Sequence, residues 1–258
     1  MSGPSTATLP MRLRQLSLPA FAVHCEPVAG RAEQGGWSFG QYLLELADLE
    51  LDQRRRRRIE RLLKRSELPG EKTLATLELG RLPQPVRRLL PTLCEGNFLE
   101  RGENLLAFGN PGTGKTHVVC AIGHELVQRG HKVLFTPAYR LVQRLLVAKR
   151  ELELEAELRR LDGFDAIVLD DIGYIQQDRD EMEVLFTLLA ERYERRSVVI
   201  TSNLVFSQWD QIFKDPMTTA AAIDRVVHHA HVLELTGPSY RGDAAKKRLQ
   251  KQRRGSRK

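Results

Sequence analysis

Short apolar runs alternate with amphipathic stretches from residue 93 onward, and this rhythm predicts an α/β domain. Between the runs, apolar residues recur at helical spacing, as at Met182, Leu185 and Leu189. Parallel strands that are covered by helices on both faces produce this alternation. We therefore predict a five-stranded parallel sheet within a domain over residues 93–237. The apolar runs that predict its strands are residues 104–108, 133–135, 166–169, 197–200 and 231–235.

The N-terminal segment, residues 1–37, lacks such a rhythm. It is rich in Pro, Gly and Ala and shows little hydrophobic periodicity. Segments of this kind bury too little apolar surface to offset the entropy of ordering the chain. We therefore expect a poorly ordered segment with one short helix near Met11–Leu16.

Helical spacing returns at Ser38, which begins the next segment. Gln41 stands three residues later, as in a capping box. The apolar and basic residues that follow predict a small helical N-terminal domain over residues 38–68. Three prolines then predict a connector over residues 69–92.

The charge is unevenly distributed along the chain. The formal net charge is +7, but residues 54–65 carry +7 and the tail, residues 238–258, carries +8, so the rest carries −8. Two basic segments on an acidic body favour a polyanionic partner, and duplex DNA is our first choice. The tail is expected to be flexible. The candidate DNA contacts are Arg54, Arg55, Arg57, Arg58, Arg61, Lys246, Lys247 and Arg248.

Two further observations restrict the class of protein. No apolar run reaches the roughly 18 residues of a transmembrane helix, so we expect no membrane association. The three cysteines, Cys25, Cys94 and Cys120, lie too far apart for a zinc motif or a disulfide framework. A reducing cytoplasm is the location that this cysteine usage favours.

A phosphate-binding loop is the most specific motif in the chain. Residues 109–116 fit the pattern G-x-x-x-x-G-K-[ST], after a predicted strand and before a predicted helix. Backbone amides of the loop bind phosphate oxygens, Lys115 reaches the β- and γ-phosphates, and the Thr116 hydroxyl binds Mg²⁺. ATP and Mg²⁺ are thus the expected ligands. The predicted nucleotide-binding residues are Gly109, Asn110, Pro111, Gly112, Thr113, Gly114, Lys115 and Thr116.

Two carboxylates follow the apolar run at 166–169. Asp170 is predicted to support the magnesium ion together with Thr116, and Asp171 to activate water as a general base. The next strand ends near Asn203, which should lie beside Asp170 in a parallel sheet and could reach the γ-phosphate. Lys115, Asp170, Asp171 and Asn203 are therefore candidate catalytic residues.

The chain resembles the IstB/DnaC-type AAA+ ATPases, most closely the IstB-like helper proteins of insertion sequences. The resemblance covers about four-fifths of the chain and is specific in combination, although the phosphate loop alone is not. The stretches that carry it, besides that loop, begin at Arg101, Leu169, Glu191, Ile200, Phe206, Ile223, His228 and Ser239.

The resemblance implies an AAA+ α/β/α core with a reduced or absent lid. It further implies ATP hydrolysis, ATP-dependent self-assembly on duplex DNA, and delivery of that DNA to a cognate transposase. By the same resemblance, Asn203 is the sensor-1 residue, Arg225 is an arginine finger for a neighbouring subunit, and Arg241 is a sensor-2-like contact. Many members have Asp-Glu where this chain has Asp170-Asp171, which favours slow hydrolysis.

Two alternatives share these features. A replicative helicase loader of the DnaC type has the same core but another protein partner. The second alternative is a scaffold protein whose binding to DNA is controlled by nucleotide. It requires ATP binding, and ATP hydrolysis is incidental to its function. The residues His228, His229 and His231 suggest a metal site, but no cysteine or further histidine pair lies near them in sequence. We therefore interpret them as residues that bind no metal.

Overall fold

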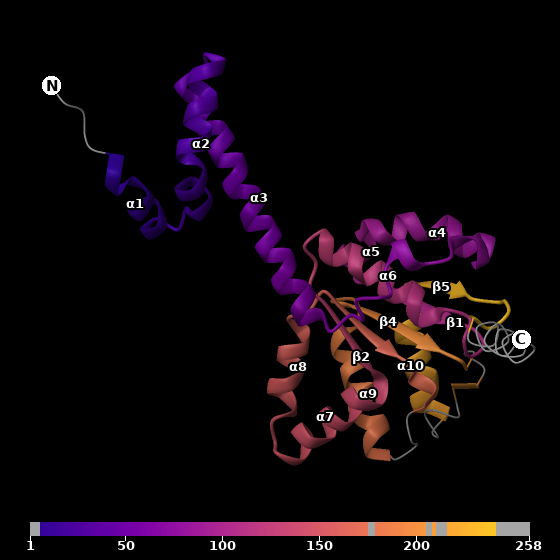
Figure 1. Cartoon of the computed structure of the whole chain (residues 1–258). Helices are drawn as coiled ribbons and strands as arrows, with labels where there is room; N and C mark the ends of the chain where they lie inside the picture. The colour runs from indigo at the N-terminus through magenta and orange to yellow at the C-terminus, as the bar shows by residue number, and fades with distance from the viewer. Residues whose placement is uncertain (1–5, 175–178, 205–207, 210–215, 241–258) are drawn as a thin grey trace, which may run out of the picture. The chain divides into compact units, whose positions relative to one another are not determined.

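A computed structural model describes residues 6–174, 179–204, 208–209 and 216–240. The chain divides into two compact units, residues 1–61 and residues 62–258. Each unit is described by itself below, with its elements labelled as in Figure 1.

The N-terminal unit is built from three helices, α1 (Leu9–Gln15), α2 (Pro19–Gly35) and most of α3 (Phe39–Ser66), preceded by the short 3-10 helix η1 (Thr6–Thr8). A small core of Cys25, Val28 and Leu46 joins α2 to α3. The buried Glu50 carboxylate accepts a hydrogen bond from the Ala20 amide at 2.8 Å and so fixes the start of α2.

The helices over residues 9–35 correct the expectation of a poorly ordered segment. The residues that α2 buries are small, namely Ala20, Ala22, Cys25 and Val28. Their weak hydrophobicity hides the amphipathic pattern, and only packing against α3 shows it. The polar contacts between these two helices are likewise invisible in the sequence.

The capping box at the start of α3 is confirmed. The Ser38 amide donates to Gln41 Oε1 at 2.8 Å, and the Gln41 amide donates to Ser38 Oγ at 3.3 Å. These reciprocal bonds satisfy backbone donors that the first helical turn leaves without partners.

The second unit contains the predicted five-stranded parallel sheet. Its strands lie in the order β2-β3-β4-β1-β5, and every neighbouring pair is parallel. The carboxyl ends of β1, β3 and β4 therefore meet at one edge. The strands are β1 (Asn104–Phe108), β2 (Val133–Pro137), β3 (Ala166–Asp170), β4 (Ser197–Ser202) and β5 (Ala230–Glu234).

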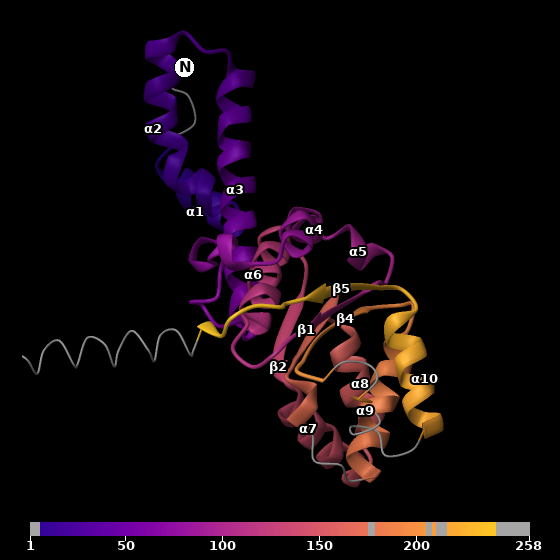
Figure 2. The same ribbon diagram turned by 90° about the vertical axis from the view of Figure 1, so that its right-hand side faces the viewer.

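Helices cover both faces of this sheet (Figures 1 and 2). One face carries α4 (Gln84–Glu95), α5 (Asn97–Glu100) and α6 (Lys115–Gln128). The other carries α7 (Ala138–Arg150), α8 (Leu154–Asp162), α9 (Arg179–Arg192) and α10 (Pro216–Val227). Three short 3-10 helices complete the unit: η2 (Leu74–Thr76), η3 (Leu79–Arg81) and η4 (Ile172–Tyr174).

Strand β1 shows how the sequence builds the two cores. Leu105 and Ala107 join the core beneath α6, whereas Leu106 and Phe108 join the core beneath α7 and α9. Successive side chains of a strand point to opposite faces, so a strand buried on both sides needs a continuous apolar run. The α/β/α architecture of an AAA+ core is confirmed.

Helix α4 corrects the predicted connector over residues 69–92. Pro85 lies in the first turn, where a helix tolerates proline because the missing amide has no intrahelical acceptor. The apolar residues Val86, Leu90 and Leu93 are buried against the sheet side of the unit. The prolines therefore do not exclude a helix here.

After β5, the described chain returns to the phosphate loop. The Leu235 amide donates to the Phe108 carbonyl at 2.7 Å, and the Tyr240 amide donates to the Gly112 carbonyl at 2.9 Å. The tail beyond Tyr240, on which the predicted absence of a lid depends, lies outside the described residues. No helix in the described part of the chain is long and apolar enough to cross a membrane.

Candidate functional site

The phosphate-binding loop connects the end of β1 to the start of α6, as predicted. Gly109, Gly112 and Gly114 adopt φ angles of 152°, 83° and 97°, which L-residues with side chains rarely adopt. A Cβ atom on Gly109 would lie 2.9 Å from Thr113 Oγ1. Glycine at these positions lets the backbone wrap closely around an anion.

Lys115 begins α6 and lies beneath this loop. Its Nζ donates to the Gly109 carbonyl at 2.6 Å and to the Asn110 carbonyl at 3.1 Å. The residue is only 8% exposed, so its ammonium group lies in a poorly hydrated environment. A cation held there attracts phosphate oxygens more strongly than one in open solvent.

Asp170, at the end of β3, is held by two hydroxyl groups. Its Oδ1 accepts hydrogen bonds from Thr116 Oγ1 at 2.8 Å and from Thr201 Oγ1 at 2.7 Å. These contacts join α6, β3 and β4 at the carboxyl edge of the sheet. A hydroxyl and a carboxylate oxygen are hard ligands that suit Mg²⁺, so the residues fit this ion.

Asp171 follows directly and has a positive φ of 64°. Its amide donates to Thr201 Oγ1 at 2.8 Å, which fixes this uncommon backbone conformation. Aspartate tolerates the left-handed region better than most residues because its short side chain forms local hydrogen bonds. Asp170 and Asp171 therefore occupy different environments, and Asp171 lines the cavity described next.

A cavity of about 230 Å³ opens above the loop. Asn203, predicted beside Asp170, borders it, and its Oδ1 atom is buried with no hydrogen-bond partner in the described structure. A buried amide oxygen without a partner is costly, which indicates that a ligand group or water pairs with it. The residues that line the cavity are Lys72, Leu77, Pro111, Gly112, Gly114, Lys115, Thr116, His117, Asp171, Thr201, Asn203 and Tyr240.

Sequence reasoning missed five of these residues as parts of the site, namely Lys72, Leu77, His117, Thr201 and Tyr240. His117 also links α6 to the segment before it, since its Nε2 lies 3.2 Å from the Thr73 carbonyl oxygen. Lys72 and Leu77 belong to the irregular segment before α4 and carry no motif. Only the Ser239-Tyr240 pair, which belongs to the family pattern, could have indicated Tyr240.

Tyr240 covers one side of the loop. An added Cβ on Gly114 would lie 3.4 Å from the Tyr240 ring. The Arg81 guanidinium stacks on that ring, 3.8 Å from its centroid, and burial raises the pKa of the phenol. The aromatic ring thus provides a flat apolar wall next to the phosphate loop.

Arg225 is not among the residues that line the cavity. It lies on α10, and its guanidinium carbon is 4.8 Å from the centroid of the Phe186 ring. Its Nη1 atom is buried and has no hydrogen-bond partner among the described residues. The structure therefore does not bring Arg225 to the cavity that the other predicted catalytic residues border or approach.

The predicted DNA contacts fall into three groups. Arg54 donates to Glu50 at 2.9 Å and to the Ser17 carbonyl at 2.8 Å within the N-terminal unit, and its side chain is 55% exposed. The guanidinium of Arg61 donates to the Arg57 carbonyl at 3.2 Å. The exposed residues of the basic stretch include Arg55, Arg57, Arg58 and Arg61. Lys246, Lys247 and Arg248 lie outside the described residues, as does Arg241, the predicted sensor-2-like nucleotide contact.

Comparison with known proteins identifies close relatives. The family described as IstB-like ATP binding protein matches residues 11–249. An insertion sequence ATP-binding protein of Sinorhizobium fredii is 42% identical over 240 residues, which cover 93% of this chain and 80% of that protein. The insertion sequence IS21 ATP-binding protein of Pseudomonas aeruginosa is 36% identical to this chain. The alignment covers 90% of this chain and 88% of that protein.

Solved structures confirm the fold. The crystal structure of DnaI aligns with a TM-score of 0.55 and 22% sequence identity. The alignment covers 66% of this chain and 95% of the DnaI chain. AMPPCP-bound DnaA from Aquifex aeolicus also has a TM-score of 0.55, with 18% identity over 66% of this chain and 51% of its own. At these identities the likeness establishes the fold alone.

Proposed function

Since the chain belongs to the family of IstB-like ATP-binding proteins, we propose that it hydrolyses ATP to control its assembly on duplex DNA and its delivery of that DNA to a transposase. The observation that carries the proposal is the cluster of Thr116, Asp170 and Thr201 beside the phosphate loop. It combines a magnesium-binding carboxylate with a cradle for the β- and γ-phosphates. Relatives named as ATP-binding proteins of insertion sequences support the biological setting.

The arrangement suggests how the chain's residues carry out hydrolysis. Backbone amides of the loop and the Lys115 ammonium bind the phosphate oxygens and neutralise charge in the transition state. Asp171 accepts a proton from the attacking water. The water oxygen then forms a bond to the γ-phosphorus, while the bond between the γ-phosphorus and the β–γ bridging oxygen breaks. ADP and phosphate are the products. Thr116 and Asp170 would hold Mg²⁺, which would supply charge neutralisation.

Asn203 and Arg225 complete the proposed machinery from two different subunits. Asn203 borders the same cavity as Asp171, and its partnerless amide oxygen could orient the attacking water. Arg225 does not line this chain's own cavity, which supports action on the nucleotide of a neighbouring subunit. The proposed homo-oligomer therefore forms complete sites only between subunits. Three free cysteines suit a cytoplasmic location for this assembly.

Mixing two inactive variants tests the proposed role of Arg225. Arg225→Ala subunits keep an intact phosphate loop, and Lys115→Ala subunits keep an intact finger. Because each site needs one part from each neighbour, mixed oligomers should recover some ATPase activity, measured as phosphate release over a range of mixing ratios. Arg195→Ala, which changes another exposed arginine of the same unit, is the matched control. If no ratio restores activity in folded, co-assembling subunits, Arg225 does not act between subunits.

Salt dependence tests the proposed DNA contacts. Each phosphate that the protein neutralises contributes about −0.9 to the slope of log K against log salt concentration. Deleting residues 243–258 should flatten that slope by a few units and weaken binding to all DNA sequences alike. Reversing the charges of Arg55 and Arg58 should also weaken binding and impair DNA remodelling. The measurement is a salt titration of duplex binding in the presence of ATP.

Arg54→Gln is a useful comparison, because the Arg54 guanidinium already forms hydrogen bonds with the Glu50 carboxylate and the Ser17 carbonyl. This change should affect the stability of the N-terminal unit more than the salt slope. An unchanged slope after both the deletion and the charge reversal would show that these cations contact a protein surface instead of DNA.

A further inference from the structure

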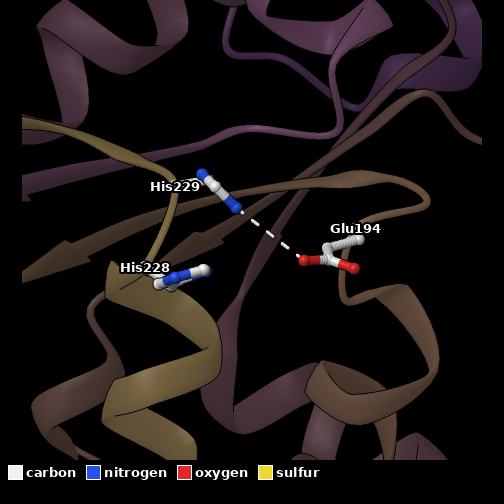
Figure 3. A group of neighbouring side chains, drawn as sticks. All are labelled: Glu194, His228 and His229. Carbon is white, nitrogen blue, oxygen red and sulfur yellow. Dashed lines mark ion pairs between the residues drawn. The ribbon is translucent and has the colours of Figure 1, made fainter.

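A cluster of two histidines and a glutamate lies at the end of the sheet opposite the phosphate loop. His228 and His229 connect α10 to β5, and Glu194 lies in the turn between α9 and β4 (Figure 3). One potential ligand atom from each residue lies within 4.8 Å of the other two. His229 Nε2 is already 3.7 Å from a Glu194 carboxylate oxygen. From this geometry we propose that these three residues form a binding site for Zn²⁺ or a similar late transition-metal ion.

The donor set determines the class of ion. Imidazole nitrogens and a carboxylate oxygen together suit Zn²⁺, Ni²⁺ and Cu²⁺, whereas Mg²⁺ and Ca²⁺ prefer oxygen ligands alone. Donors around a tetrahedral zinc ion lie about 3.4 Å apart, given bond lengths near 2.1 Å. The three side chains are exposed, so small rotations can close the remaining distance. Three protein ligands leave a fourth position for water or for a group from a partner.

Tyr193 supports the cluster from the side. Its hydroxyl lies 3.2 Å from Nδ1 of His228. In the His228 tautomer whose Nδ1–H group donates to this hydroxyl, the lone pair lies on Nε2 and is available to a metal ion. Partners of this kind orient metal-binding side chains before the ion binds.

The backbone of Glu194 is also held in place. Glu194 has a positive φ of 54°, which is uncommon for a residue with a side chain. A Cβ atom on Gly102 would lie 2.9 Å from the Glu194 carbonyl carbon, so only glycine permits this close approach. The turn is therefore fixed where its carboxylate faces the histidines.

Sequence spacing could not reveal this site, because Glu194 lies more than thirty residues before the histidines. His231, the third histidine of the run, does not join the cluster. Its Nε2 is 3.0 Å from Glu103 Oε2 instead. The fold thus places His228 and His229 beside Glu194 and separates them from His231, which forms an ordinary hydrogen bond.

A bound ion would add a link between the turn after α9 and the turn after α10, which already contact each other through Tyr193 and His228. Arg225 lies three residues before His228, on the last turn of α10. A bound ion would therefore restrain the segment that carries Arg225. The metal site itself does not depend on the role of Arg225 or on the proposed function.

Calorimetric titration with Zn²⁺ tests the proposal on the untagged full chain after removal of metal with a chelator. Saturating AMPPCP and Mg²⁺ occupy the phosphate loop and Asp170, so that zinc does not bind there. We expect one Zn²⁺ per chain, with affinity lowered roughly tenfold or more in Glu194→Gln and in His228→Gln. His24→Gln, in the N-terminal unit, should bind as the unchanged chain does.

Thermal unfolding provides a second readout. Zn²⁺ should raise the Tm of the unchanged chain and of His24→Gln, but not that of Glu194→Gln. Without metal, all variants should unfold at similar temperatures, because the cluster is exposed. If Glu194→Gln or His228→Gln unfolds at a clearly different temperature, His229→Gln is tested in its place. Absence of zinc binding, or binding that the cluster substitutions leave unchanged, overturns the proposal.

Discussion

Lys115→Ala is expected to abolish ATP binding and, with it, ATP-dependent assembly. Lys115 is the buried ammonium group beneath the phosphate loop, and it faces the position of the β- and γ-phosphates. Charge-assisted hydrogen bonds contribute about 1.5–3 kcal/mol each. Two lost phosphate contacts therefore lower affinity by a factor on the order of 100 or more. Fluorescence titration with a labelled ATP analogue measures this change directly.

Lys132→Ala is the matched control, because Lys132 is exposed and forms its hydrogen bonds with Asp165 and Ala166 through its backbone. It should bind the analogue with unchanged affinity. Wild-type affinity in a folded Lys115→Ala protein would show that the loop is not the nucleotide site.

Asp171→Asn should separate ATP binding from hydrolysis. The amide keeps the size of the carboxylate, and asparagine also tolerates the positive φ at this position. The variant should therefore fold and bind ATP normally. Loss of a general base lowers turnover by a factor of about 10²–10⁴, and DNA complexes should last longer. Phosphate release and dissociation from labelled duplex DNA measure the two effects.

Asp171→Glu makes this test sharper. It restores the carboxylate at a longer reach, as in many proteins that the chain resembles, so turnover should persist. Unchanged turnover in Asp171→Asn would assign Asp171 a structural role, with the base elsewhere.

The sequence predicted the sheet well because its strands are buried on both faces. A short continuous apolar run such as residues 104–108 has few interpretations other than a strand covered by helices on both faces. The capping box at Ser38 was equally clear, because its contacts are local. Helix α2 was missed because it buries small residues, and α4 because Pro85 lies in its first turn and Pro91 stands inside the helix, where proline is uncommon.

The site was predictable only where its residues are contiguous or follow a strand. The phosphate loop and Asp170 meet both conditions, and the structure brings them together. Thr201 and Tyr240 reach the site through strand order and through the return of the chain after β5, which no local pattern encodes. Glu194 likewise reaches the histidines only through the fold.

The central claim is that bound ATP controls assembly on duplex DNA. Electron microscopy of the purified protein with duplex DNA tests it most directly, comparing ATP with no nucleotide and the unchanged chain with Lys115→Ala. We predict regular oligomers along the DNA for the unchanged chain with ATP, and none without nucleotide or with Lys115→Ala. Equal assembly under all of these conditions, or no assembly with ATP, would contradict the claim.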